Sequence, residues 1–533
     1  MFAGPTEREK GKKMATTTGV KIVLTASATE MSDFYNNPFV AFVGGFAKGP
    51  TPLWFVRNWL YPPVPRNGDG TAKYAPYGLR KIEALLLDNG FSESEVAVVH
   101  PSDLDKFVGP ETKAVGISSM DPTGLAYVSK TYSSLVGGGE PMNAIEFRKL
   151  VTHPSIRRHH PKIIVGGFGA WQLERKKVAD SYGVDCVVIG EGEQIATEIF
   201  SKAVKDEQLP RVARIEKTDN GKVVTIRHPA IHGCVEITRG CGRNCQFCTP
   251  TMQKRRDIPL DRILREVEVT IREGSPSVTL VTEDLFLYGL KDPKFVPNRE
   301  AVIKLVKKVA SVPGVKSIQP SHSALAPVVC DPKMVEELAE ILLEHYLYSL
   351  GNKPLVTSEV GLETGSVRLM RKYMAGKMLP YMPEEWKEVV TQSFGIMNDN
   401  DWYPLGTIIV GLPEEKEEDV NETLIMLDML HDYKAFYVPL FFVPLENCVL
   451  MHKQGQELDT LTQKRWEVLV RCWEYNVRIW KDSFLQHRIP NPLMYKLIRN
   501  VAVPFGAKTA GIYYGLKHGK MMTDAIWRMA TAQ

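Results

Sequence analysis

Residues 235–250, VEITRGCGRNCQFCTP, decide the fold and most of the chemistry of this chain. An apolar, β-rich segment, VEITRG (235–240), runs directly into Cys241, Cys245 and Cys248, which are spaced C-x₃-C-x₂-C. Cysteine thiolate is the usual protein ligand of a [4Fe–4S] cluster, so three thiolates can hold three of its irons. The fourth iron would then be open to a small molecule.

Zinc is the main alternative occupant of this motif, because it also binds thiolates. A structural zinc site, however, usually takes four protein ligands, and Cys234 is the nearest candidate for the fourth. The segment from Cys234 to Cys241 has the pattern of a strand, and seven strand residues rise roughly 23 Å. Both ends of such a strand cannot reach one metal ion, so the sequence favours an open cluster.

Length and composition describe an ordinary globular chain. Its 533 residues are enough for about three domains. Hydrophobic residues make up 44% and charged residues 24%, and the net charge of +4 is too small to indicate a nucleic-acid or membrane partner. Eight cysteines without a disulfide framework favour a reducing, cytoplasmic location. Residues 1–19 are polar and charged, which predicts a disordered tail.

The region 233–450 is predicted to fold as a partial (β/α)₆ barrel. Six β-rich segments recur there: 235–240, 277–284, 317–325, 355–364, 407–412 and 435–445. Helical patterns separate them, including those at 260–274 and 331–350. Alternating strands and helices imply a parallel sheet, and barrel sites lie where the strands end. The cysteines follow the first strand at that position.

The region 20–210 is predicted to be a doubly wound, Rossmann-like α/β domain. Its buried strands are expected at 21–27, 96–101, 114–122, 162–170 and 186–193, with amphipathic helices at 75–91 and 193–206. Ligands of such sheets bind beyond the carboxyl ends of the strands. Residues 211–232 contain an Asn-Gly turn and predict a hairpin linker, and residues 451–533 predict a helical C-terminal domain.

The cysteine spacing, with Phe247 just before the third cysteine, resembles the radical S-adenosylmethionine (SAM) superfamily. This resemblance implies that the open iron binds the amino and carboxylate groups of SAM. One electron from the cluster would then cleave SAM to a 5′-deoxyadenosyl radical. The backbone near Phe247 and Val410 would border the adenine.

Two further segments resemble the SAM contacts of that superfamily. Thr282, Glu283 and Asp284 end the second strand, where the family usually has Gly-Gly-Glu, and a carboxylate there could accept hydrogen bonds from an ammonium group. Glu363 and Thr364, in GLETGS, resemble the segment that contacts the ribose or carboxylate. The strand and loop GTIIVGLPEE (406–415) resembles the adenine-side strand, although its glycine spacing departs by one residue. No catalytic residue is assigned.

The N-terminal domain is similar to the cobalamin-binding domain that precedes many radical SAM barrels. The resemblance rests on APYGL at the first helix, a Gly-Gly turn after the fourth strand and GEGE after the fifth. The cobalamin contacts that it implies are Ser118, Ser119, Gly166, Gly167, Gly190, Glu191 and Gly192. None of the 12 histidines has an aspartate two residues before it, so the D-x-H-x-x-G signature of cobalt ligation is absent. A receiver-like domain that only packs on the barrel is the alternative.

The resemblance implies a cobalamin-dependent radical SAM C-methyltransferase that modifies an unactivated sp³ carbon. Taken across its length, the chain is similar to archaeal members that methylate a peptide carbon after translation. The expected partners are a protein or peptide substrate, namely a glutamine of the methyl-coenzyme M reductase alpha subunit, and an electron donor. The expected cofactors are a [4Fe–4S] cluster, SAM and cobalamin.

Three alternatives remain open. Other cobalamin-dependent radical SAM enzymes methylate small molecules or form rings oxidatively, and their motifs overlap with these. A methylthiotransferase is disfavoured because the N-terminal domain lacks the second cysteine triplet that its auxiliary cluster needs. A non-catalytic cobalamin or redox sensor is disfavoured because an electron-transfer cluster normally has four protein ligands.

Overall fold

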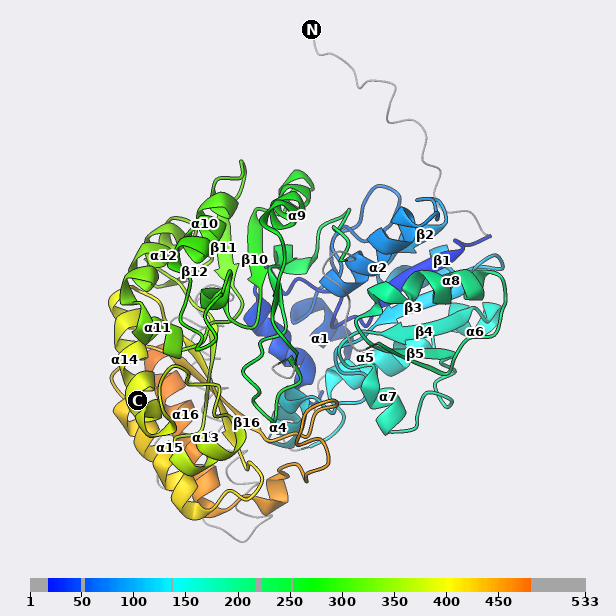
Figure 1. Cartoon of the computed structure of the whole chain (residues 1–533). Helices are drawn as coiled ribbons and strands as arrows, with labels where there is room; N and C mark the ends of the chain where they lie inside the picture. The colour runs from blue at the N-terminus through cyan, green and yellow to red at the C-terminus, as the bar shows by residue number, and fades with distance from the viewer. Residues whose placement is uncertain (1–17, 49–52, 136–137, 216–222, 251–252, 481–533) are drawn as a thin grey trace. The chain divides into compact units, whose positions relative to one another are not determined.

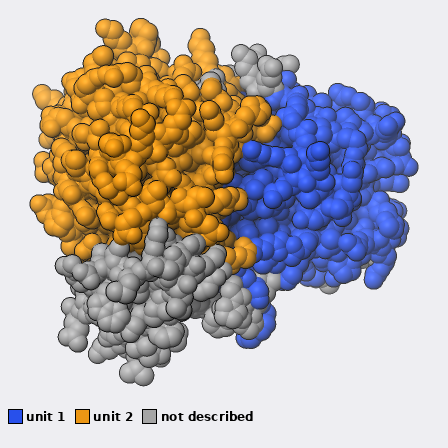
Figure 2. All heavy atoms as spheres, turned by 90° about the horizontal axis from the view of Figure 1, so that it is seen from below, with its two compact units in different colours: residues 1–129, 140–234, 272–275 blue, residues 130–139, 235–271, 276–533 orange. Residues whose placement is uncertain are grey.

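The computed structural model describes residues 18–48, 53–135, 138–215, 223–250 and 253–480. Figure 1 shows the course of the chain, which divides into the two compact units coloured in Figure 2. Unit 1 comprises residues 1–129, 140–234 and 272–275, and unit 2 comprises residues 130–139, 235–271 and 276–533. Among the helices described, none combines the length and apolarity needed to cross a membrane.

Unit 1 is built on a six-stranded parallel sheet with the spatial order β2-β1-β3-β4-β5-β6. The strands are β1 (Ile22–Ala26), β2 (Val96–Val98), β3 (Ala114–Ser118), β4 (Lys162–Gly166), β5 (Cys186–Gly190) and β6 (Val212–Ile215). The order reverses direction at β1, which makes the sheet doubly wound and places a topological switch point between β1 and β3. The α/β fold class predicted from the sequence is confirmed.

Helices cover the sheet of unit 1. The longer ones are α2 (Tyr77–Asp88), α5 (Met142–Val151) and α8 (Ala196–Val204), and the shorter ones are α1 (Leu53–Trp59), α3 (Leu104–Phe107), α6 (Pro154–His159) and α7 (Trp171–Arg175). Helices α2 and α8 pack apolar side chains such as Leu86 and Phe200 on one face, against Leu24 and Ile164 of the strands. The alternate residues Val23, Val115 and Val165 are fully buried as well. The strands are therefore apolar on both faces, as expected for a parallel sheet.

The predicted hairpin at 211–232 is wrong for its first arm. Residues Val212–Ile215 form β6, which pairs in parallel with β5 and adds an edge strand to the sheet. Residues 216–222 lie outside the described part, and residues 223–229 contain no strand. The alternation of apolar and polar residues in this segment therefore reflects an edge strand. Ala213 is buried on one face of this strand, and Arg214 is exposed on the other.

The barrel strands described in unit 2 form two three-stranded sheets with the orders β11-β10-β7 and β14-β15-β16. They are β7 (Cys234–Glu236), β10 (Ser277–Val281), β11 (Ser317–Pro320), β14 (Glu359–Glu363), β15 (Leu405–Val410) and β16 (Phe436–Phe441). The pairs β10–β11, β14–β15 and β15–β16 are parallel, and a parallel bridge between His322 and Glu359 links the two sheets. The result is a partial (β/α) barrel.

Helices separate successive barrel strands (Figure 1). They are α9 (Leu260–Arg272), α10 (Arg299–Ala310), α11 (Ala326–Cys330), α12 (Pro332–Glu344), α13 (Val367–Tyr373), α14 (Trp386–Asp399) and α15 (Glu417–Met429), while α4 (Tyr127–Leu135) contains residues of both units. Asp331 begins α12 by accepting a hydrogen bond from the Met334 amide, followed by a proline at the first helical position.

The helical prediction for 331–350 extends too far. Helix α12 ends at Glu344, and β12 (Tyr348–Leu350) then pairs antiparallel with β13 (Lys353–Leu355). Gly351 has a φ of +62° at the turn between these strands. The Gly-Asn dipeptide at 351–352 is a hairpin-turn signal that sequence reasoning overlooked.

The predicted C-terminal domain is described only as far as residue 480. Helix α16 (Gln463–Trp480) packs on the last barrel strand, where the Asn476 side chain hydrogen-bonds both the N–H and the carbonyl of Tyr437. Its Trp466 and Trp473 rings meet edge to face with 6.4 Å between centroids. Residues 481–533, and residues 1–17 of the predicted tail, lie outside the described part.

Candidate functional site

The three cysteines lie in one closed loop between two short strands of unit 2. Strands β8 (Thr238–Arg239) and β9 (Arg256–Asp257) pair antiparallel at its base. Gly240 has a φ of +73°, and a Cβ there would lie 2.9 Å from the carbonyl oxygens of Gln253 and Lys254. Only glycine fits at this entrance. We call residues 240–250 and 253–255 the cysteine loop.

The thiols of the cysteine loop are sheltered from solvent. Cys241 and Cys245 are buried, and Cys248 is half-buried. Burial raises the pKa of Cys245 to about 12, against an opposing effect of Lys377. Burial likewise raises the pKa of Cys241, with Arg243 opposing the rise. The two thiols lie close enough for a negative charge on one to raise the pKa of the other.

This donor set fits an iron–sulfur cluster in its chemistry. Within the described residues, no three Cys, His, Asp or Glu side chains are already gathered about one point as in a formed metal site. Metal binding requires deprotonated thiols and commonly completes the geometry of its own site. Three thiols within eight residues supply three such ligands, and the buried Arg243 and the half-buried Lys377 oppose the rise in thiol pKa that burial causes.

Two distant segments hold the cysteine loop in place. The Gln246 amide donates to the Tyr373 carbonyl at the end of α13, over 2.8 Å. The Leu450 amide donates to the Gln246 carbonyl over 3.1 Å, and the Thr249 hydroxyl donates to the Glu446 carbonyl over 2.7 Å. The loop is therefore fixed by backbone contacts rather than by its own short strands alone.

Of the three residues predicted at the end of β10 to bind SAM, two are buried and bonded within the protein. The Thr282 hydroxyl lies 2.6 Å from that of Thr238. Asp284 Oδ1 accepts hydrogen bonds from the amides of Phe286, at 3.2 Å, and Ala324, at 3.0 Å. These contacts fix the strand end and point to a positioning role for both residues.

Glu283, the third of these residues, is exposed to solvent. Its pKa is nevertheless raised, first by burial and further by Glu359, while His322 opposes the rise. Its side chain is exposed, whereas those of Thr282 and Asp284 are buried. Glu283 is thus the member of its group that is open to a ligand.

His322 and Glu359 form a polar pair that sequence reasoning missed. His322 follows β11 by two residues, and its Nε2 lies 3.4 Å from Glu359 Oε2 at the start of β14. Both side chains are partly exposed. The available signal was the histidine in SIQPSHSAL, because residues just beyond barrel strands commonly line the site.

Glu363, predicted to contact SAM, forms a buried ion pair with Lys377. The Lys377 ammonium donates to Glu363 Oε1 over 2.8 Å, and Glu363 has the unusual φ of +60° at the end of β14. Burial alone would lower the pKa of Lys377, but Glu363 and Cys245 outweigh it and raise that pKa. No sequence pattern pointed to Lys377, which lies in a loop beyond α13.

The other predicted SAM contacts differ in accessibility. Thr364 is fully buried, and its hydroxyl accepts a hydrogen bond from the Ser366 amide and lies 3.0 Å from that of Thr423. Val410, the last residue of β15, is also buried. Phe247 in the cysteine loop is half-buried. The contacts predicted for Thr364 and Val410 would therefore have to come mainly from their backbone.

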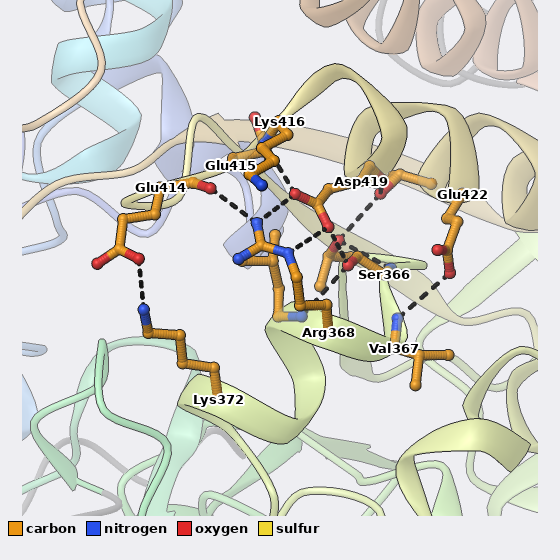
Figure 3. A network of polar contacts seen from close by, with 12 residues as sticks. Ser366, Val367, Arg368, Lys372, Glu414, Glu415, Lys416, Asp419 and Glu422 are labelled. Atoms are coloured by element: carbon orange, nitrogen blue, oxygen red, sulfur yellow. Dashed lines mark hydrogen bonds and ion pairs between the residues drawn. The ribbon is translucent and has the colours of Figure 1, made fainter.

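A polar network joins the loops that follow β14 and β15 (Figure 3). The Asp419 carboxylate accepts hydrogen bonds from the Ser366 hydroxyl at 2.5 Å and the Lys416 amide at 2.8 Å, and it pairs with Arg368. The Arg368 guanidinium also donates to the Glu414 carbonyl over 2.7 Å. The segments GLETGS and GLPEE, predicted to flank SAM, are thus held together as one edge.

In unit 1, the predicted cobalamin contacts meet at one edge of the sheet. Ser118, Gly166 and Gly190 are the last residues of β3, β4 and β5, and Ser118 pairs in register with Gly166. The remaining predicted contacts follow these strand ends directly: Ser119, Gly167, Glu191 and Gly192. The structure therefore brings the whole set to the edge where ligands of doubly wound sheets bind.

Two of these glycines cannot be replaced without strain. Gly167 has a φ of +92°, and a Cβ there would lie 2.7 Å from the Ser119 carbonyl oxygen. Gly190 has a φ of +101°, and its Cβ would lie 1.9 Å from the Ile215 carbonyl oxygen. Both glycines are exposed, so the edge presents backbone that a flat ligand could approach closely.

Large apolar side chains are exposed next to this backbone. Met120, two residues beyond β3, is 54% exposed, and Phe168, two residues beyond β4, is 44% exposed. A cluster of exposed large apolar groups commonly marks a surface that another molecule covers. We call residues 118–120, 166–168 and 190–192 the glycine edge.

Glu30 is a further polar group at the glycine edge, and sequence reasoning missed it. It follows β1, and its Oε1 accepts hydrogen bonds from the Met120 amide at 3.1 Å and from the hydroxyls of Ser119 and Ser27, both at 3.3 Å. Burial raises the pKa of Glu30 to about 7. This contact joins the loops after β1 and β3, at the topological switch point.

Comparison with known protein families bears on unit 2. The family model described as the Radical SAM superfamily matches residues 235–427, which include the cysteine loop and the strands from β7 to β15. This part of the chain is therefore similar to the radical SAM domain. Such a domain implies a [4Fe–4S] cluster and SAM as its cofactors.

The curated relatives are more distant in sequence. The chain is 24% identical over 334 residues to a tRNA-2-methylthio-N(6)-dimethylallyladenosine synthase of Corynebacterium efficiens, which covers 60% of this chain and 59% of that protein. Across the first four relatives of this kind, the chain spans between 53% and 60% of their length.

Two solved structures share the fold over nearly the whole chain. TsrM from Kitasatospora setae, a radical SAM methyltransferase with cobalamin and a [4Fe–4S] cluster bound, has a TM-score of 0.52 at 14% identity and covers 96% of this chain and 99% of its own. OxsB, a cobalamin-dependent SAM radical enzyme with aqua-cobalamin and SAM bound, has a TM-score of 0.52 at 12% identity, covering 96% and 74%. At these identities the likeness establishes the fold.

Proposed function

We propose that this chain is a cobalamin-dependent radical SAM C-methyltransferase. The observation that carries the proposal is that one chain contains two different candidate cofactor sites. A radical SAM domain holds the cysteine loop, and a doubly wound sheet presents the glycine edge at its carboxyl end. TsrM and OxsB, which combine the same folds, were both solved with cobalamin bound.

The residues have distinct roles in this proposal. Cys241, Cys245 and Cys248 hold the cluster, which supplies the electron that cleaves SAM, while cobalamin supplies the methyl group. Glu283 is open to solvent, so it can accept a hydrogen bond from the SAM ammonium. Asp284 and Thr282 fix the strand end that presents it.

The glycine edge suits the corrin ring for a steric reason. Exposed backbone at Gly167 and Gly190 permits close approach, and the apolar side chains of Met120 and Phe168 would be covered by the macrocycle. Unit 1 contains no D-x-H-x-x-G sequence, so no histidine of that signature would ligate the cobalt.

For the substrate, we propose an unactivated sp³ carbon of a peptide, specifically a glutamine of the methyl-coenzyme M reductase alpha subunit. The resemblance of the whole chain to archaeal enzymes of this kind supports it. Methylation of a free amino acid or another small molecule is the closest alternative, because a tryptophan substrate is bound in another TsrM structure that shares the fold.

A methylthiotransferase is the second candidate, because curated relatives have that activity. Such enzymes need a second cysteine triplet for an auxiliary cluster. Only Cys186 and Cys234 precede the cysteine loop in the sequence, and Cys186 is buried within β5. The cysteine content therefore favours the methyltransferase.

Anaerobic reconstitution with iron, sulfide and hydroxocobalamin tests the proposal. About four irons, one cobalamin and 5′-deoxyadenosine under a strong reductant would support it, and methylation of synthetic peptides from the reductase would identify the substrate. About eight irons without cobalamin would favour the methylthiotransferase. Zinc in place of iron would overturn the assignment of the cysteine loop.

A further inference from the structure

The segment from Tyr373 to Leu379 contacts the cysteine loop at several points, and we call it the clamp segment. It follows α13 in unit 2 and was not singled out by any sequence motif. Besides the bond from the Gln246 amide to the Tyr373 carbonyl, the Gln246 side chain donates to the Lys372 carbonyl just before it, over 3.1 Å. The loop thus lies directly on this segment.

Arg243 makes the most extensive of these contacts. Its side chain is 4% exposed, and Nη1 donates to the carbonyls of Gly376 at 3.1 Å and Lys377 at 2.9 Å. Its guanidinium carbon lies 4.5 Å from the centre of the Phe295 ring, and Nη2 lies 3.5 Å from Asp284 Oδ2. Arg243 lies between Cys241 and Cys245 in the sequence. The contacts of its side chain therefore also restrain the backbone between these two cysteines.

The clamp segment approaches the loop too closely for a side chain at one point. A Cβ on Gly376 would lie 2.1 Å from the carbonyl oxygen of Arg243. The clamp segment therefore meets the loop in two ways. Its carbonyls accept hydrogen bonds from the Arg243 guanidinium, and its backbone at Gly376 comes so close to the loop that only glycine fits.

The clamp segment also brings a buried charge to the thiols. Lys377 is held by Glu363 at 2.8 Å, its side chain is 16% exposed, and it acts electrostatically on Cys245. Three thiolate ligands carry three negative charges, and reduction adds another. A buried cation stabilises the more negative state because charges interact strongly where water is excluded. The net charge around a cluster is one of the factors that set its reduction potential.

We infer that the clamp segment positions and tunes the cluster: Arg243 fixes the cysteine loop on it, and Lys377 raises the reduction potential of the bound cluster. Glu363 opposes Lys377, since it places a negative charge beside the same site. Lys377 is accordingly a positioning residue that acts through the cluster. This inference rests on the cluster of the proposed function, but it does not depend on cobalamin, on SAM or on the substrate.

Opposite charge changes within one ion pair provide the sharpest test. The reconstituted full-length protein, without cobalamin or SAM, is titrated with dithionite while the reduced cluster is followed by electron paramagnetic resonance. Lys377→Met should lower the midpoint potential, and Glu363→Gln should raise it. Lys372→Met is the matched control, because that lysine lies five residues earlier, is 41% exposed and pairs with Glu414. The cluster potential of this variant should equal that of the wild type.

The charge role of Lys377 would be overturned if the midpoint potentials of Lys377→Met and Glu363→Gln shifted in the same direction, or did not shift, while both variants kept the wild-type iron content. If Lys377→Met fails to hold iron, Lys377→Arg decides, because it keeps the charge: a wild-type potential supports the inference, and a lowered one contradicts it. A wild-type protein that binds zinc instead of iron would remove the proposed function and this inference together.

The contact at Gly376 tests the positioning role separately. Gly376→Ala should lower the iron retained after reconstitution by at least half and broaden the resonance signal. Gly395→Ala is the control, since the nearest atoms to its Cβ lie 3.7 Å away, and it should retain full iron. Full iron and an unchanged signal in Gly376→Ala would contradict the close contact as a positioning device.

Discussion

The two candidate cofactor edges of this molecule are built in opposite ways. The glycine edge of unit 1 presents backbone and apolar side chains, and the neighbouring acid Glu30 is held among neutral donors. The barrel edge of unit 2 presents buried or half-buried opposite charges in pairs: Arg243 with Asp284, Lys377 with Glu363, and Arg368 with Asp419. Shape organises the first edge, and electrostatics organises the second.

This difference follows from what each edge is proposed to bind. A corrin ring is flat and large, so binding it requires close approach over a wide area, which glycine permits. SAM and a thiolate-bound cluster carry several charges, so binding them requires counter-charges whose positions are fixed. Changes of charge should therefore be most severe in unit 2, and changes of shape most informative in unit 1.

The largest expected effect is the loss of the cluster. Cys245→Ala should abolish iron binding and SAM cleavage, because two thiolates cannot replace three, and it should leave cobalamin binding intact. Iron, cobalamin and 5′-deoxyadenosine are measured after reconstitution. Cys330→Ala, outside the loop, is the control and should keep all three. Survival of SAM cleavage in Cys245→Ala would show that the cluster is held elsewhere.

The next effect in size is the loss of a buried charge that joins two loops. Burial alone would raise the pKa of Asp419, but hydrogen bonds from Arg368 and Ser366 outweigh it and lower that pKa. Asp419→Asn keeps the shape and removes the charge, so unfolding free energy should fall by about 2–4 kcal/mol. Urea unfolding at pH 7 measures it. The Glu422→Gln control breaks the more exposed pair with Lys387 and should cost about 1 kcal/mol or less.

The fold and the site differ in how far sequence predicts them. The strands of the parallel sheets, apart from the edge strand β6, were found because buried parallel strands are apolar over their length, as in IVLTA and SVTLV. The loop with Cys241, Cys245 and Cys248 was found because its ligand spacing is local. In both cases the signal lies within a few consecutive residues.

The contacts that connect distant segments were not predictable in this way. Lys377 meets Glu363 across 14 residues, and Asp419 meets Ser366 across 53, with no pattern that marks the partners. Glu30 is an ordinary acid in the sequence, and its pKa is raised because the fold buries it. Hydrogen bonds from Ser119 and Met120, which lie 89 and 90 residues away in the sequence, oppose that rise. Tertiary structure supplies these environments.

Glu30 makes the stability of unit 1 depend on pH. Its pKa rises from 4.5 to about 7 on folding, so the folded state holds a proton that the unfolded state has released. Its stabilising contribution is complete below pH 4.5 and is lost as the pH rises through 7. Glu30→Gln should therefore match the wild type at pH 4.5 and exceed it by about 3 kcal/mol at pH 8.

Urea unfolding of the wild type and Glu30→Gln at both pH values measures this difference. The control is Glu93→Gln, a change at an exposed acid, which should leave the pH dependence unaltered. Equal stability of Glu30→Gln and the wild type at pH 8 would show that Glu30 ionises freely in the fold.

The smallest change tests whether shape alone organises the glycine edge. Gly167→Ala adds one methyl group at a φ of +92°, where it would lie 2.7 Å from the Ser119 carbonyl oxygen, so the loop must shift. A left-handed conformation costs a non-glycine residue about 1–2 kcal/mol, and we expect cobalamin to bind about tenfold more weakly, which corresponds to about 1.4 kcal/mol.

The control is Gly78→Ala in α2, which adds the same methyl group where no atom lies within 4 Å. This change should alter neither the stability of the protein nor its affinity for cobalamin. Iron content should stay at the wild-type level in both variants, because the cluster depends on the other unit. Unchanged cobalamin affinity in Gly167→Ala would mean that the ring does not rest on this edge, and the contrast between the two edges would then lose its functional meaning.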